Sequence, residues 1–187
     1  MGKELGVFLV RPKNLQSKFE DAELKYDGKM EKGALADWVK TNYHGLCGHR
    51  TSDNAKDFKL PLVTAYYDVD YSKNVKGTNY WRNRVMKVAK NFPQLNFAVS
   101  NKNDMQHEAD EFGLDVMTAD KPLVGVKSDK GKFVMKEAFA MDTFEQFLKD
   151  FEGNGFIKFL IFYHFPMRKY PNYLTFDNFL ILLKLAR

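Results

Sequence analysis

Cys47 is the one cysteine of the 187-residue chain, and it stands in the sequence Cys47-Gly48-His49-Arg50. Disulfide exchange uses a pair of thiols, commonly spaced Cys-X-X-Cys, because the second thiol releases the mixed disulfide that the first one forms. Arg50 occupies the position of that second thiol. We therefore interpret Cys47 as a free linker thiol and expect the chain to be inactive alone, with thiol oxidoreductase activity through Cys47 as the alternative function.

Sulfur and imidazole are ligands of zinc, and His44, Cys47 and His49 lie within six residues of one another. Three ligands without a distant fourth one are a weak pattern, so we predict a turn with surface histidines, no metal and no cofactor. Four carboxylates elsewhere resemble acid/base pairs, but no nucleophile is near them in the sequence, so we expect solvated charges. These carboxylates are Asp68, Asp70, Glu108 and Asp110.

Aromatic rings and cations gather between residues 65 and 92, where an apolar run passes through a polar loop into a helical pattern. Lys76 and Arg84 flank Trp81 in this segment. Cations around an aromatic ring attract and anchor an acidic partner. Taken by themselves such cations are ordinary surface charge, whereas their combination with aromatic rings indicates a docking surface for an acidic partner.

The overall charge is modest, with 29 basic and 24 acidic residues and a pI near 9.1. Because no long basic block is present, we expect no nucleic-acid partner. The early apolar run, residues 7–10, is too short for a signal peptide, and residues 184–187 are not a retention tetrapeptide. The best apolar run, residues 156–165, has ten residues with a lysine inside it, so no membrane span is expected.

The elements that must position these residues follow from hydrophobic periodicity and from glycine and proline positions. Strands are expected at 7–10, 22–26, 60–69 and 95–99, and a hairpin at 123–126 and 133–135. Helices are expected from Met30 to Gly45, at 79–92, from near Asp104 to Gly113, and from Asp142 to Gly153. This order predicts an α/β fold with a mixed, thioredoxin-like sheet that carries helices on both faces.

Several segments of this chain together resemble the protein disulfide isomerase family. They are Ala65-Tyr66-Tyr67-Asp68-Val69-Asp70-Tyr71, Lys76-Gly77, Asn79-Tyr80-Trp81-Arg82-Asn83-Arg84-Val85, Leu95-Asn96-Phe97-Ala98-Val99 and Lys132-Phe133-Val134-Met135. Within that family they are most similar to the isomerases of the endoplasmic reticulum that associate with calnexin and calreticulin. The similarity extends over about 150 residues in one register.

The resemblance implies three regions. Residues 1–45 look like the end of a non-catalytic thioredoxin-like (b) domain, and residues 46–153 look like a second one (b-prime). Both catalytic domains of the family are absent from the sequence given, and 154–187 is an apolar tail of unknown role. The tail also suggests, as a weaker alternative, contact with a membrane surface.

The resemblance also implies partners and sites. Lys18, Lys76, Trp81 and Arg84 would bind the acidic arm of calnexin or calreticulin, and unfolded glycoprotein clients would be further partners. Pro122 would be the cis-proline that precedes a strand in thioredoxin-like folds. The implied location is the lumen of the endoplasmic reticulum.

Overall fold

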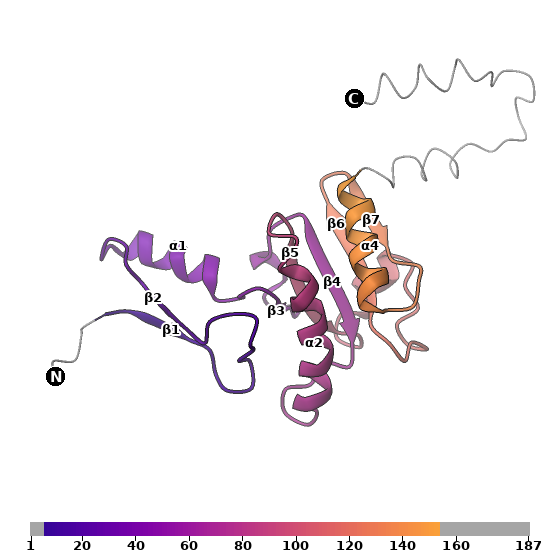
Figure 1. Cartoon of the computed structure of the whole chain (residues 1–187), viewed down its shortest axis with the longest axis horizontal. Coiled ribbons are helices and arrows are strands. Elements are labelled where there is room, and N and C mark those ends of the chain that lie inside the picture. The colour runs from indigo at the N-terminus through magenta and orange to yellow at the C-terminus, as the bar shows by residue number, and fades with distance from the viewer. Residues whose placement is uncertain (1–5, 154–187) are drawn as a thin grey trace, which may run out of the picture. The chain divides into compact units, whose positions relative to one another are not determined.

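A computed structural model describes residues 6–153 of the chain. Residues 1–147 belong to one compact unit and residues 148–187 to another. Figure 1 labels the elements. The strands are β1 (Phe8–Val10), β2 (Glu23–Lys25), β3 (Gly48–His49), β4 (Leu62–Tyr67), β5 (Asn96–Asn101), β6 (Leu123–Ser128) and β7 (Gly131–Val134). The helices are α1 (Lys32–Asn42), α2 (Val75–Ala89), α3 (Gln106–Glu111), α4 (Met141–Glu152) and the 3₁₀ turn η1 (Ala55–Asp57).

The N-terminal segment, residues 6–45, is a two-stranded antiparallel hairpin followed by one helix. Strand β1 pairs with β2 in the register Phe8 to Lys25, and α1 follows. Both predicted strands and the predicted helix are confirmed. No residue of α1 is buried, and Phe8 and Val10 are 40% and 60% exposed. This segment therefore contributes little to the apolar core of the described residues.

A five-stranded mixed sheet forms the larger part, in the order β3-β5-β4-β6-β7. Strand β4 lies at its centre, parallel to β5 and antiparallel to β6. The β6–β7 hairpin closes at Gly131, whose φ of +131° is a conformation that side-chain-bearing residues rarely adopt. The predicted thioredoxin-like α/β class with a mixed sheet is confirmed.

Helices cover both faces of this sheet, as the alternation along β4 demonstrates. Tyr66 packs into a buried cluster with Met105 and Ala109 on the α3 side. Its neighbour Tyr67 points the other way and donates its hydroxyl to the Thr78 carbonyl of α2 over 2.8 Å. Helix α4 begins on the α2 side, since the Phe144 ring lies 6.5 Å from that of Phe97. Figure 1 shows α2 and α4 over the same face.

Some predicted details were wrong. The predicted helix 79–92 begins earlier, at Val75, because the Asn74 side chain accepts the Gly77 N–H and caps the first turn. The two-residue β3 and the η1 turn were not predicted. The Lys121–Pro122 bond is not cis, whereas Leu60–Pro61 is. The two isomers of an X-Pro bond differ by only about 0.5–1 kcal/mol, so the surrounding packing rather than the sequence decides between them.

Two remaining expectations concern the ends of the chain. Within residues 6–153, no helix is both long enough and apolar enough to cross a membrane. The predicted tail, 154–187, lies outside the described residues. The boundaries predicted at 45/46 and 153/154 stay predictions.

Candidate functional site: a basic and aromatic face of helix α2

The exposed face of α2 combines cations with an aromatic ring. Lys76, Tyr80 and Arg84 follow one another at intervals of four residues, so their side chains lie along one side of the helix. The Arg84 guanidinium stacks over the Tyr80 ring at 3.4 Å, and its Nη1 donates to the Tyr80 carbonyl. Tyr80 is 50% exposed. The helix contains no Asp or Glu, so nothing on it neutralises these cations.

Lys18 reaches the same helix from the N-terminal segment. The neighbouring Ser17 donates its hydroxyl to the Asn83 side chain over 2.9 Å, next to Arg84 in the sequence. Lys18 and Lys90 both lie over the Phe19 ring, at 5.4 and 5.6 Å. In the described part of the chain no ion pair involves the cations of this face. We call the following set the α2 patch: Lys18, Lys76, Tyr80, Trp81, Arg84, Lys87 and Lys90.

Trp81 lies at the border of the α2 patch and is only half-buried. Its indole meets Tyr80 edge-on at 4.8 Å and Phe139 edge-on at 5.6 Å, and the Arg84 guanidinium is 5.7 Å from it. Trp81 therefore supports the exposed rings while Phe139 fixes it from the core side. Tyr80, rather than Trp81, is the more exposed ring of the patch, and the sequence reasoning had not singled it out.

A buried charge network holds the segment that carries Lys18 against α2. Glu20 accepts from Arg82 Nη2 at 2.9 Å and lies 3.4 Å from Arg11 Nη2, and its other contact is the Leu46 N–H at 2.8 Å. Arg82 also donates to the Leu15 and Cys47 carbonyls. Side chains of Arg11, Glu20 and Arg82 are only 8, 8 and 3% exposed. This network positions Lys18 relative to Lys76 and Arg84.

Sequence reasoning missed this network, although one signal pointed to it. Arg82 occupies the inward side of α2 with Thr78, Val85 and Ala89, which are all buried. A cation on the apolar side of an amphipathic helix requires a buried anion, because an unpaired buried charge is very costly. The partner, Glu20, is 62 residues away in the sequence, and no spacing rule identifies it.

The surroundings of Cys47 disfavour both thiol exchange and metal binding. Its side chain is fully buried, and burial raises the thiol pKa to about 12, so the nucleophilic thiolate is scarce at neutral pH. Of the two histidines, His44 is packed between the rings of Tyr43 and Phe58 at 3.7 and 3.8 Å. Within residues 6–153, His, Cys, Asp and Glu side chains form no cluster of three that could hold a metal.

Comparisons with known proteins agree with this fold. Residues 6–150 match the family described as thioredoxin-like domain. Protein disulfide-isomerase A3 of Gallus gallus is 46% identical over 160 residues, which cover 80% of this chain and 32% of the relative. Protein disulfide-isomerase A4 of Mus musculus is 36% identical over 150 residues, covering 77% and 24%.

A solved structure fits the same region. The crystal structure of the bb fragment of ERp72 is 34% identical, with a TM-score of 0.70, and the match covers 79% of this chain and 67% of that one. This chain belongs to the protein disulfide isomerase family. It spans about a third or less of the length of the curated relatives it matches. The described residues correspond to a b-type thioredoxin-like domain of this family, and Arg50 stands where a second thiol would stand in a Cys-X-X-Cys pair.

Two half-buried histidines of this chain, His44 and His49, predict that its stability depends on pH. Burial lowers the pKa of His44, although Asp57 opposes the shift, and burial likewise lowers that of His49 against the opposing charge of Asp104. The neutral imidazoles are therefore favoured in the folded state. The two neutral imidazoles contribute their full stability above about pH 6.5, which is about the pKa of histidine in the unfolded chain. This contribution is lost as the pH falls below that value, because histidines of the unfolded chain bind protons before those of the folded chain.

We expect the free energy of unfolding to fall by up to about 1 kcal/mol between pH 7.5 and 5.5 through these two groups. Urea titrations at both pH values would measure it. The double variant His44→Gln plus His49→Gln should have a flatter profile. His107→Gln is the control, since that side chain is 95% exposed and should leave the slope unchanged. Equal slopes in the double variant and the parent would refute the assignment.

Proposed function

We propose that this chain is a non-catalytic recruiting module that binds an acidic protein partner through the α2 patch. The observation that carries the proposal is the unopposed positive charge of α2, with Lys76, Tyr80 and Arg84 aligned on its exposed side. Elsewhere in the described residues, basic side chains such as Arg50 and Lys132 form ion pairs with glutamates. Within residues 6–153 the cations of the α2 patch have no such partner, and they attract anions from solution.

The aromatic side chains of the α2 patch provide an anchor for the partner, which charge alone does not provide. Interfaces are anchored by a few well-packed aromatic and arginine side chains, while peripheral cations mainly accelerate encounter. Tyr80 stacked beneath Arg84 is a pre-arranged pair of this kind, and Trp81 supports it from behind. An acidic segment that carries its own aromatic side chain would use both features.

The family resemblance suggests which acidic partner this is. We infer that it is the acidic arm of calnexin or calreticulin, and that the module acts in the folding of disulfide-bonded glycoproteins in the lumen of the endoplasmic reticulum. Unfolded clients would then be brought to it by the lectin chaperone. The buried thiol with its raised pKa gives no support to the alternative, an oxidoreductase that uses Cys47.

The test is a titration of the chain with the isolated acidic arm at low and at high salt. We expect the double reversal Lys76→Glu plus Arg84→Glu to weaken binding at least about 30-fold at low salt, because two attractions become repulsions. Raising the ionic strength from 0.1 to 1 M shortens the screening length from about 10 to about 3 Å, so parent binding should weaken strongly.

The matched control is Lys29→Glu plus Lys32→Glu, which makes the same change in net charge on and just before α1. It should retain near-parent affinity if the location of the charge matters. Binding that survives the α2 reversal, or that both reversals weaken equally, would overturn the proposed site.

A further inference from the structure

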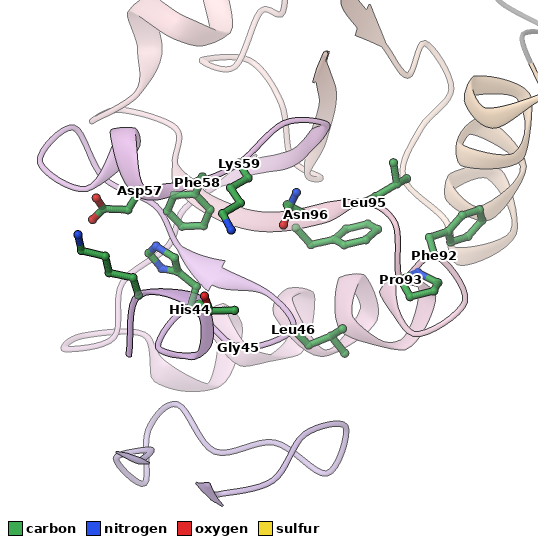
Figure 2. Close-up of a pocket in the computed structure, with 13 residues that line it drawn as sticks. His44, Gly45, Leu46, Asp57, Phe58, Lys59, Phe92, Pro93, Leu95 and Asn96 are labelled. Carbon is green, nitrogen blue, oxygen red and sulfur yellow. The ribbon is translucent and has the colours of Figure 1, made fainter. Parts of the chain in front are cut away.

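A second concave site, lined by no residue of the α2 patch, lies between the end of the N-terminal segment and the start of β5. It is a cavity of about 250 Å³. Figure 2 shows His44 and Phe58 stacked at one end, Phe92, Pro93 and Leu95 at the other, and Lys59 and Asn96 between them. Sites for drug-sized ligands measure about 300–1,000 Å³, so this one suits one aromatic group, the size of an aromatic side chain, with a small substituent.

The apolar walls of the cavity are built from the core of the domain. Phe92, Leu95 and Phe97 line it and are 3, 7 and 4% exposed, so the packing behind them holds these side chains in place. Phe58 forms the remaining wall and is held face to face with His44 at 3.8 Å and 26°. Walls of this kind receive a flat apolar group with little loss of side-chain freedom.

The polar groups of the cavity indicate the charge of its ligand. Lys40 and Lys59 line it, and neither takes part in an ion pair within the described residues. The one carboxylate of the lining, Asp57, already accepts the Tyr43 hydroxyl at 2.6 Å. Two cations therefore face one engaged anion. The site favours an anionic group.

His44 adds an unmet hydrogen-bonding requirement. Its Nε2 is buried and has no partner in the described residues. A buried polar atom left unpaired costs stability, and such an atom in a pocket wall often marks the place of a ligand group. Because burial lowers the pKa of His44, the imidazole is neutral at pH 7 and can donate its one N–H to an oxygen.

We propose that this cavity binds an aromatic carboxylate, with the ring against the Phe58 and Phe97 walls and the carboxylate between Lys59 and His44. The source is either a free aromatic acid or an aromatic residue next to an acidic one in a polypeptide. Both present the same chemistry. The proposal does not depend on the function proposed for the α2 patch.

The experiment follows backbone amide shifts of the full chain in ¹H–¹⁵N spectra while two probes are titrated. The small probe is indole-3-acetate, and the peptide probe is N-acetyl-Trp-Asp-amide. Saturable shifts are expected at His44, Leu46, Lys59 and Asn96, with a dissociation constant on the order of 1 mM for the small probe. Tighter binding of one probe than of the other identifies the source.

Matched controls separate the contributions of ring and charge. The neutral isostere indole-3-acetamide should bind at least about tenfold more weakly, and acetate should produce no saturable shift at these amides. Lys59→Glu should weaken indole-3-acetate at least about tenfold. Lys56→Glu, in the adjacent η1 turn but outside the lining, should leave its affinity unchanged.

His44→Phe keeps the ring stack and removes the Nε2 donor, so it should weaken binding of the acid. Equal affinity for acid and amide, or indifference to Lys59→Glu, would overturn the proposal. So would loss of binding in the Lys76→Glu plus Arg84→Glu variant, because the probe would then be reporting on the α2 patch. Failure of this site leaves the test with the acidic arm unaffected.

Discussion

Replacing Glu20 by alanine is expected to lower the free energy of unfolding by about 3–5 kcal/mol, because it leaves two buried guanidinium groups without their anion. The side chains of Arg11 and Arg82 are 8 and 3% exposed and share this one carboxylate. The Leu46 N–H would lose its acceptor as well. Urea unfolding followed by near-ultraviolet circular dichroism would measure the loss.

Two further variants make the Glu20 prediction specific. Glu20→Gln keeps an acceptor for Leu46 but removes the charge, so it should recover only part of the loss. Asp21→Asn changes the exposed carboxylate next door and should stay within about 0.5 kcal/mol of the parent. A Glu20→Ala variant as stable as Asp21→Asn would contradict the role given to the network.

Glu108 is the second site where one substitution should have a large effect. It accepts both guanidinium nitrogens of Arg50, at 2.6 and 2.7 Å, and the Tyr66 hydroxyl at 2.6 Å. Arg50 and Glu108 are 5 and 18% exposed, so water replaces little of this contact. We expect Glu108→Gln to cost about 2–3 kcal/mol in urea unfolding at pH 7, somewhat less than for a fully buried pair.

The acid dependence tests the same contact independently. Burial by itself would raise the pKa of Glu108, but the hydrogen bonds from Arg50 and Tyr66 outweigh it, and the pKa is lowered. Its stabilisation is therefore present above the unfolded pKa of about 4.5 and is lost as the pH falls through the folded value. The stability gap between the parent and Glu108→Gln should narrow between pH 5 and pH 3.

The exposed neighbour Asp110 provides the control for Glu108. Asp110→Asn should stay close to the parent at both pH values, since that side chain lies on the solvent side of α3. A gap between parent and Glu108→Gln that stays constant down to pH 3 would show that the ion pair does not carry the effect.

The fold was largely predictable from the sequence, because its elements have strong periodic signals. The apolar run at 60–69 and the stripe of α2 became β4 and its covering helix. Two-residue β3 has too little sequence to show any period, and it forms because Gly48 and His49 pair with Ala98 and Val99. Elements of that size depend on tertiary pairing and cannot be read locally.

The candidate site was predictable only in part. Lys76 and Arg84 are eight residues apart on one helix, so their common face follows from helix geometry. The position of Lys18 depends on contacts from Ser17 to Asn83 and from Glu20 to Arg82, both more than 60 residues apart in the sequence. The same holds for the cavity, where His44 and Asn96 come from different elements. Contacts between residues so far apart in the sequence depend on tertiary packing, and residue spacing does not predict them.

Gly45 joins α1 to the charge network in a way that leaves no room for a side chain. Its φ is +66°, and a β-carbon there would lie 2.1 Å from a Glu20 carboxylate oxygen and 2.9 Å from the Arg11 guanidinium. Any substitution would strain the backbone and displace the ion pair together. Gly45 is therefore fixed both by its backbone conformation and by the charge network that it contacts.

The sequence distance between Glu20 and Arg82 has a consequence during synthesis. The carboxylate leaves the ribosome 62 residues before its guanidinium partner. At about 5–20 residues per second, this delay amounts to roughly 3–12 s. Over that time Glu20 has no guanidinium partner from α2, so the ion pair that holds the segment of Lys18 against this helix forms only after α2 has been synthesised.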